Sequence, residues 1–307
     1  MSTDATIADP ASTVLSYGTA VRATRIERIP HSGDRIWTRT APLPDHRFAR
    51  FDGAPPSRRG GPRFIVGRGD DATRTYDLPA AESLAATALC GGSERVHWPS
   101  VYRQWGNALS LLHRRGPARP SAPTAEPPAR TRLRNWWFTP ESSDARREHA
   151  RSDFLGALTE SARARLDDVL VSDLSVSDVV VHGWAGLGLS VLGPDGRVVV
   201  LLGEDVGRAP AEYDLGALIA QSVELAVFSP PGTAPSPTDM RTALFDGYAA
   251  TSESTAPCST KLCDHTIEHV VRHVCDFVQF AEFDDSELSR WSSLVNWLDQ
   301  NSRSADR

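Results

Sequence analysis

The most unusual feature of this 307-residue sequence is its near lack of lysine, because Lys261 is the single lysine and every other basic residue is arginine. A codon bias toward arginine would account for the pattern without any effect on the fold. The chemical consequence holds whatever the cause. No lysine in the N-terminal half is available to hold the phosphates of a bound nucleotide.

Long hydrophobic runs are also missing, since none approaches the roughly 18 apolar residues that a membrane-spanning helix needs. The first residues have neither a basic start nor an apolar core, so we expect no secretory signal. Four cysteines (Cys90, Cys258, Cys263 and Cys275) at irregular spacing do not suggest a disulfide framework. The net charge of -6 disfavours binding to nucleic-acid phosphates. We therefore expect a cytoplasmic protein that binds neither nucleic acid nor membranes.

What the sequence does contain is a dense group of motifs between Val179 and Gln221. An apolar run ends in His182-Gly183, and a glycine-containing loop follows. The Pro-Asp-Gly turn within 193–196 then leads to a second expected strand over 197–202. The acidic pair Glu204-Asp205 comes next, and a helix opens near Glu212 and Asp214.

In order and spacing, these motifs resemble the core of the aminoglycoside phosphotransferase and choline kinase family. That family has His-Gly-Asp, four residues, Asn, a hairpin, Ile-Asp-Trp or Ile-Asp-Phe, and then Pro-x-Tyr-Asp-Leu, which is matched here by Pro210, Tyr213, Asp214 and Leu215. The resemblance implies an α+β, two-lobed protein-kinase-like fold with a small β-rich N-terminal lobe and a larger helical C-terminal lobe. An active member would use ATP and magnesium.

The positions that shape the backbone match the family, whereas the positions that carry out phosphoryl transfer do not. Trp184 stands at the catalytic Asp, Leu189 at the metal-binding Asn and Leu202 at the metal-binding Asp. An indole only donates one N–H, and magnesium demands oxygen ligands. The resemblance therefore indicates a kinase-like fold that lacks an ordinary kinase site.

Two carboxylates next to the lost positions leave an alternative open. Glu204 and Asp205 would serve as displaced metal ligands if the chain slipped by one or two residues, or they would only cap or solvate the start of the helix. Asp214 has another role by resemblance, since the acid at this helix start accepts hydrogen bonds from the loop that contains His182 and Gly183.

The N-terminal lobe holds two further candidate residues. By resemblance, the strand over 62–69 would carry the phosphate-binding lysine, and Arg68 is its nearest basic group. Glu82 then matches the helix glutamate that pairs with this basic residue, or it is a solvated glutamate in the first turn of a helix. The turn at 31–34 would lie over the nucleotide phosphates, or it is an ordinary hairpin loop.

Along the chain we expect disorder over 1–15, the N-terminal lobe over 16–98, the helical lobe over 99–300 with its core at 179–221, and a frayed tail over 301–307. The composition also favours an irregular insertion over 41–62 and a linker over 116–128. Hydrophobic periodicity and turn residues predict strands over 21–30, 35–40 and 62–69, and helices over 79–89, 101–115, 153–170, 212–228, 239–250, 262–283 and 286–300.

Two other clusters allow a functional or a purely structural interpretation. The triplet Trp136-Trp137-Phe138 is either a ligand platform or buried packing. Histidines spaced by four on one helix can share a zinc ion with a nearby cysteine, or they only present polar groups to a neighbouring lobe. The residues of this second cluster are Cys258, Cys263, His265, His269, His273 and Cys275.

Three hypotheses for function follow. The leading one is a degenerate member of the family, a pseudokinase that acts as a binding or scaffold component with a protein or peptide partner. The resemblance places such a protein in the biosynthesis of a modified peptide or antibiotic, where relatives phosphorylate serine or threonine before elimination. The alternative is an active ATP-dependent transferase with displaced metal ligands, acting on a hydroxyl of a peptide or small molecule. The third is a metal-dependent enzyme that uses the histidine helix.

Overall fold

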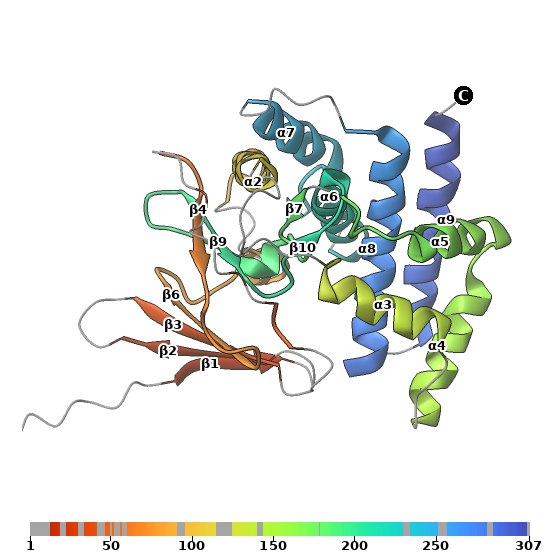
Figure 1. The fold of residues 1–307 in the computed structure, drawn as a ribbon, viewed down its shortest axis with the longest axis horizontal. Coiled ribbons are helices and arrows are strands. Elements are labelled where there is room, and N and C mark those ends of the chain that lie inside the picture. Colours follow the sequence, from red (N-terminus) through yellow and green to blue (C-terminus); the bar gives the residue numbers. More distant parts are fainter. Residues whose placement is uncertain are drawn as a thin grey trace, which may run out of the picture.

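The computed structural model describes residues 13–18, 23–29, 34–41, 47–49, 51, 56, 60–90, 96–114, 125–139, 144–177, 179–229, 234–250, 257–280 and 285–305. The strands of the N-terminal lobe lie on one side and the long helices lie on the other (Figure 1). This is the two-lobed α+β architecture that the sequence predicts. The expected turn at 31–34 falls almost wholly outside the described residues, as do most of the expected insertion and linker.

The N-terminal lobe is built on an antiparallel sheet in which the strands follow the order β1-β2-β3-β6-β5. Buried residues of β2, β3 and β6 (Ile26, Trp37, Tyr76 and Leu78) lie in a common core, where the ring of Trp37 donates its Nε1–H to Ala80 O at 2.9 Å. The first strand begins at Thr13, inside the segment expected to be disordered. The strands are β1 (Thr13–Gly18), β2 (Ala23–Arg28), β3 (Arg35–Thr40), β5 (Arg68–Gly69) and β6 (Thr73–Leu78).

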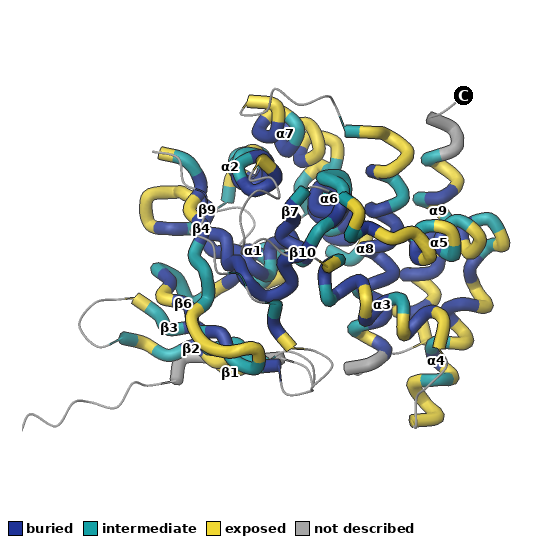
Figure 2. Tube along the Cα trace, viewed as in Figure 1, coloured by how far each residue is buried: buried dark blue, intermediate teal, exposed yellow. Residues whose placement is uncertain are grey.

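The single strand expected over 62–69 is two strands in different sheets, β4 (Arg63–Val66) and β5. Strand β4 pairs in parallel with β9 (Val198–Leu202), from Arg63 opposite Val199 to Val66 opposite Leu202, and β9 pairs in turn with β8 (Ser190–Leu192). A third, small sheet joins β7 (Val180–Val181) to β10 (Gly207–Arg208). Because all five side chains of β9 are buried between the lobes, this mixed sheet ties the N-terminal lobe to the core motifs (Figure 2).

The helical lobe contains the remaining elements. Helix α6 lies at its centre and is buried along much of its length (Figure 2). The helices are α2 (Trp98–His113), α3 (Pro128–Phe138), α4 (Ala145–Ala157), α5 (Glu160–Val171), α6 (Ala211–Phe228), α7 (Pro237–Ala249), α8 (Ser259–Phe280) and α9 (Asp285–Ala305), with a 3₁₀ helix η3 (Leu187–Leu189). No helix in these described segments is long and apolar enough to cross a membrane.

Two of the expected helices differ from their predicted bounds for local reasons. The helix expected over 79–89 shrinks to α1 (Leu84–Leu89), because the Ser83 hydroxyl caps it by accepting from Ala86 N. The single helix expected over 153–170 is two helices, since Thr159 caps the start of α5 and its own N–H is held by the Asn296 side chain. Helix α3, which follows Pro127, is absent from the predicted set. The expected frayed tail is still helical to Ala305.

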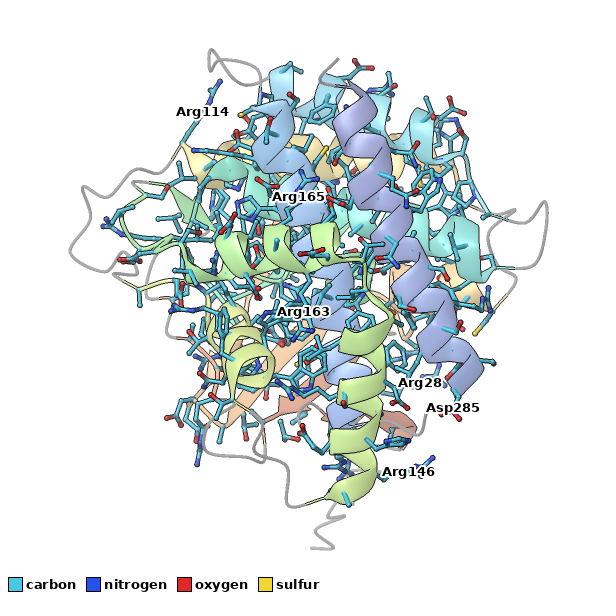
Figure 3. The ribbon with its side chains drawn as sticks, turned by 90° about the vertical axis from the view of Figure 1, so that its right-hand side faces the viewer. Arg28, Arg114, Arg146, Arg163, Arg165 and Asp285 are labelled. Carbon is cyan, nitrogen blue, oxygen red and sulfur yellow. The ribbon has the colours of Figure 1, made fainter. Side chains whose placement is uncertain are left out.

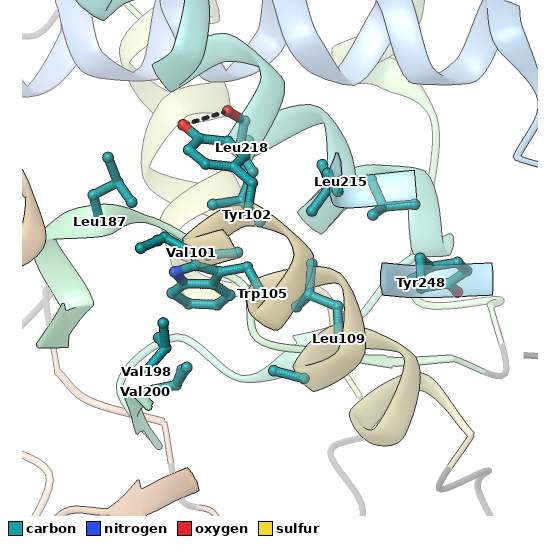
Figure 4. Packing of buried hydrophobic residues seen from close by; sticks show 14 of the residues in the cluster. Val101, Tyr102, Trp105, Leu109, Leu187, Val198, Val200, Leu215, Leu218 and Tyr248 are labelled. Atoms are coloured by element: carbon teal, nitrogen blue, oxygen red, sulfur yellow. Dashed lines mark hydrogen bonds between the residues drawn. The ribbon is translucent and has the colours of Figure 1, made fainter. Parts of the chain in front are cut away.

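Helices α2 and α7 cross at very short range, and two glycines make this possible. A Cβ on Gly106 would lie 2.1 Å from Leu244 O, and one on Gly247 would lie 2.0 Å from Arg103 O. The crossing presses α2 onto the core, where Trp105 and Leu109 pack between the sheet and α6 (Figure 4). The Tyr102 hydroxyl donates to Leu218 O at 3.4 Å and links α2 to α6.

We expect Gly106→Ala to lower the free energy of unfolding by about 1–3 kcal/mol, because the added methyl group meets backbone atoms that cannot move independently. Gly156→Ala is the matched control. It lies on α4 with no atom within 4 Å of the added Cβ, and should leave stability unchanged or raise it by up to about 1 kcal/mol. Urea denaturation measures both, and equal midpoints for the two variants would contradict the close crossing.

Candidate functional site

The loop after β7 keeps its shape through the carboxylate of Asp214, in the first turn of α6. Asp214 Oδ2 accepts from His182 N at 2.6 Å, and Oδ1 accepts from Gly183 N at 3.0 Å. The His113 imidazole adds a third contact from α2, since its Nε2 lies 3.0 Å from Oδ2 and its Nδ1 lies 3.1 Å from the Tyr248 hydroxyl. A carboxylate only accepts, so Nε2 carries a proton that points to Asp214.

His182 is a structural residue of this loop. Its ring is buried, with Nε2–H donating to Leu201 O at 2.7 Å and Nδ1 accepting from Trp184 N at 3.3 Å. Burial lowers the pKa of the imidazole, and nearby Asp214 only partly opposes that effect. A neutral ring with both nitrogens engaged has no free proton site for catalysis.

Gly183 has to be glycine, because its φ is +82° and a Cβ would lie 1.7 Å from Asp205 O. The loop and the acidic turn therefore touch backbone to backbone. Arg272, on α8, also binds this loop, since its Nη1 donates to Gly183 O at 3.3 Å.

Trp184, at the position of the catalytic Asp, is packed between hydrophobic and cationic groups. One part of the ring contacts the N-terminal-lobe core, which includes Leu189. The guanidinium carbon of Arg272 lies 4.5 Å from the ring centroid, and that of Arg132 lies 5.4 Å away. These distances are typical of cation–π contacts. Two positive charges thus stand where a proton-accepting carboxylate would be needed.

The other lost positions are equally unsuited to metal. Leu189 and Leu202 are buried, each in an apolar cluster. Neither offers an oxygen atom through its side chain, and magnesium requires several. The donor set at these positions does not fit magnesium, and we derive no reaction step through it.

The two neighbouring carboxylates point to different lobes. Glu204 is buried against the N-terminal lobe, where Arg39 Nε lies 2.6 Å from its Oε1 and the Tyr76 hydroxyl donates to the same oxygen at 3.0 Å. Asp205 is buried against α3, with Arg132 Nη1 3.1 Å from its Oδ1. The structure therefore gives the two candidate metal ligands separate arginine partners.

Sequence reasoning missed the residues that surround this site from the helical lobe: Arg132, Arg272 and Asp276. Asp276, on α8, is held near both arginines, and burial raises the pKa of its carboxyl group against their influence. No local signal marks these residues, because each is one polar position on an ordinary helix, far along the chain from the loop.

The N-terminal candidates Arg68 and Glu82 are not brought together. Arg68 is exposed and forms an ion pair with Asp77 across the β5–β6 pair. Glu82 is exposed just before α1, and within the described part of the chain it has no ion-pair partner. The structure thus shows Arg68 as a solvated strand residue.

The histidines of α8 are each held by a neighbouring group. His265 Nδ1 lies 2.8 Å from Glu268 Oε2, His269 Nε2–H donates to Tyr213 O at 2.8 Å, and His273 Nδ1 lies 2.8 Å from Glu224 Oε2. Among the residues that the structure describes, no three His, Cys, Asp or Glu side chains are grouped to hold a metal ion. Cys258 is exposed, whereas Cys275 is buried, so the cluster is spread along the helix.

In the aromatic triplet 136–138, the two tryptophans are buried and the phenylalanine is exposed. Trp136 and Trp137 are buried against α4 and α5, and Trp137 Nε1–H donates to Asp167 Oδ1 at 2.7 Å. Phe138, the last residue of α3, is exposed. The two tryptophans are therefore core residues.

Removal of the Asp214 carboxylate should weaken the whole fold. We expect Asp214→Ala to lower the free energy of unfolding by at least about 1–3 kcal/mol, because two buried backbone N–H groups and His113 lose their acceptor. Asp246→Ala is the control, since that carboxylate is exposed and pairs with exposed Arg103. Chemical denaturation with equal midpoints for the two variants would show that Asp214 does not hold the loop.

The buried His269 should make stability depend on pH. Burial, followed by the charge of Arg272, holds its pKa well below the ordinary value of about 6.5. The unfolded chain thus binds a proton at this histidine more readily than the folded chain does. The contribution of neutral His269 to the free energy of unfolding is therefore complete above pH 6.5 and is lost as the pH falls below that value. His269→Gln should flatten the loss between about pH 6.5 and 5, by up to about 1.4 kcal/mol per pH unit. Urea titrations with exposed His149→Gln as control test this, and identical slopes for the two variants would contradict it.

No protein-family model matches the chain, and no curated protein sequence matches it significantly. Solved structures do match over nearly its whole length. An ethanolamine kinase from Plasmodium vivax gives a TM-score of 0.55 at 8% identity, over 96% of this chain and 83% of the other. A choline kinase from Cryptosporidium parvum gives 0.52 at 9% identity, over 96% and 89%. Choline kinase LicA from Streptococcus pneumoniae gives 0.50 at 12% identity, over 95% of each chain. The chain thus has the two-lobed kinase-like fold of these choline and ethanolamine kinases, as the spacing of its core motifs predicts.

Proposed function

We propose that this protein is a phosphotransferase-like binding or scaffold component that does not itself transfer phosphate. We place it in a pathway that builds a modified peptide or an antibiotic, with a protein or peptide as its partner. The support for the pathway is the motif resemblance, and the support for a non-catalytic role is the geometry of the loop. A cytoplasmic location remains a prediction from the sequence.

One observation carries the non-catalytic part of the proposal: Glu204 and Asp205 are held in separate buried ion pairs. A shared magnesium ion would need both carboxylates to turn toward one point. Turning Asp205 away would leave Arg132 buried without its counter-ion, and breaking a buried pair in this way typically costs about 3–5 kcal/mol. Turning Glu204 away would leave both Arg39 and the Tyr76 hydroxyl without it. The ion pairs therefore oppose the displaced-ligand alternative.

The proton-accepting group is missing for an independent reason. A hydroxyl nucleophile in phosphoryl transfer needs a positioned acceptor for its proton. Trp184 offers none, because its indole only donates, and the two guanidinium groups against its ring would repel a metal ion. His182 is neutral, buried and fully hydrogen-bonded. Loss of metal ligands and loss of the base thus coincide at one loop.

The proposal predicts that the protein binds magnesium-ATP weakly or not at all and releases no ADP. Isothermal titration calorimetry with and without Mg²⁺ measures the first property, and a coupled ADP assay with serine- or threonine-containing peptides measures the second. We expect the variant with Glu204→Gln and Asp205→Asn to lose stability without any change in these readouts. Asp195→Asn is the control, because this carboxylate is exposed in the β8–β9 turn.

A magnesium-dependent dissociation constant in the low micromolar range, together with ADP release that disappears in the double variant, would overturn the proposal. Such a result would establish the active transferase with displaced ligands instead. Trp184→Asp combined with Leu202→Asp restores the acids of the family. Magnesium-dependent nucleotide binding gained only by this variant would support the assignment of the lost positions.

A further inference from the structure

A cavity of about 680 Å³ opens on the side of the helical lobe away from the β9 sheet. It lies where the chain leaves α5 and returns to β7, and the first turns of α6 and α8 and the end of α7 complete its wall (Figure 1). Figure 3 looks onto the neighbouring face of α4, α5 and α9 and labels Arg165, which pairs with the cavity residue Asp264. None of the described residues that line the cavity comes from the loop 182–189.

The cavity has a strong excess of negative charge. Asp168, Asp173, Glu212 and Asp264 line it, opposed by Lys261 in the wall and by Arg165, which pairs with Asp264. Three of these carboxylates each accept a hydrogen bond that orients them. The donors are Ser175 N for Asp173 at 2.9 Å, Cys258 N for Glu212 at 2.8 Å and Arg165 Nε for Asp264 at 2.6 Å. The bonds from Ser175 also lower the pKa of Asp173, so this group stays ionised.

A buried imidazole provides a second, independent polar group in the wall. His265 is only 4% exposed, and its Nδ1 lies 2.8 Å from Glu268 Oε2. Burial raises the pKa of Glu268, but Arg130 and His265 outweigh it and leave that pKa below its ordinary value. A carboxylate only accepts, so the Nδ1–H of His265 points to Glu268, and a neutral ring in this geometry presents Nε2 as an acceptor. In the described part of the chain nothing pairs with Nε2, although the ring lines the cavity.

Aliphatic side chains stand beside these acceptors. Val176 lines the cavity and is 79% exposed, and Val169 and Leu174 line it as well. Carboxylates and a lone-pair nitrogen accept hydrogen bonds from a guanidinium or ammonium group, and an exposed aliphatic rim fits apolar neighbours of that group. A free inorganic cation would make no use of the rim.

We propose that this cavity is the docking site for a basic segment of a peptide or protein partner, with an arginine or lysine side chain entering it and aliphatic neighbours resting on Val176. The inference rests on the proposed binding function and deepens it by naming the chemistry of the partner. Lys261 occupies part of the same acidic field, so it competes with the incoming cation.

The probe for this site is a nine-residue amidated peptide with a central arginine flanked by leucines, carrying a fluorophore for anisotropy with the full-length protein. Its twin has citrulline in place of arginine, which keeps the shape and removes the charge. We expect the citrulline peptide to bind about tenfold more weakly or worse, and binding of the arginine peptide to weaken with salt. Free arginine should compete only at far higher concentration, because it makes no contact with the rim.

Three variants locate the binding. Asp168→Asn with Asp173→Asn should weaken the arginine peptide by about tenfold, whereas Glu160→Gln, at the other end of α5, should not change its affinity. His265→Asn retains an amide donor for Glu268 but lacks the Nε2 acceptor, and should weaken the peptide at unchanged melting temperature. Lys261→Gln should strengthen binding a few-fold, because it removes the competing cation.

Equal binding of the arginine and citrulline peptides, an unchanged affinity in the double Asn variant, or competition by free arginine at the same concentration as the peptide would each overturn the assignment. The last result would identify a small-cation site. Such a failure is separable from failure of the proposed function. If neither peptide binds and magnesium-ATP still does not bind, only the cavity assignment fails, whereas magnesium-dependent ADP release by the wild type refutes the proposed function itself.

Discussion

The shape of the core depends on one buried carboxylate. Asp214, on α6, collects donors from two segments that are far from it in sequence: the loop at His182-Gly183, and helix α2 through His113. Each donor would be costly if left unpaired in the interior. The need to pair the backbone N–H groups of His182 and Gly183 does not depend on which side chain stands at position 184. The fold can therefore lose its reactive residues and still keep a kinase-like loop.

Arginine supplies the cations of the buried ion pairs around this loop. Arg39 holds Glu204 to the N-terminal lobe, and Arg132 holds Asp205 to α3. A planar guanidinium bonds in several directions at once and also packs flat against an indole, as Arg272 does on Trp184. An ammonium group offers neither geometry in the same way. The contacts around this loop thus depend on arginine, in a sequence that contains almost no lysine.

Local patterns predicted what depends on local chemistry. The motif spacing from His182 to Asp214 was sufficient for the fold class, the loop and the start of α6, because turns, caps and strand lengths are encoded by neighbouring residues. The partner of β4 could not be found in this way, since its pairing with β9 joins residues more than a hundred positions apart. Arg132 and Arg272 were missed for the same reason. A polar residue on a helix reveals its partner only when the helix is placed. The break between α4 and α5 could have been predicted from the sequence, because threonine is a common N-cap residue and the Thr159 hydroxyl caps α5.

The first turn of α6 also explains how one element can serve both a closed loop and an open cavity. Glu212 and Asp214 are two residues apart, so on a helix with 3.6 residues per turn their side chains project in nearly opposite directions. Asp214 turns inward to the loop, whereas Glu212 turns to the acidic cavity, where the backbone of Cys258 orients it. The same backbone is held by His269, which donates to Tyr213 O between the two acids. Because the inward acid fixes this turn, the outward acid is presented at a defined position, and a rigid binding surface is obtained without any catalytic residue.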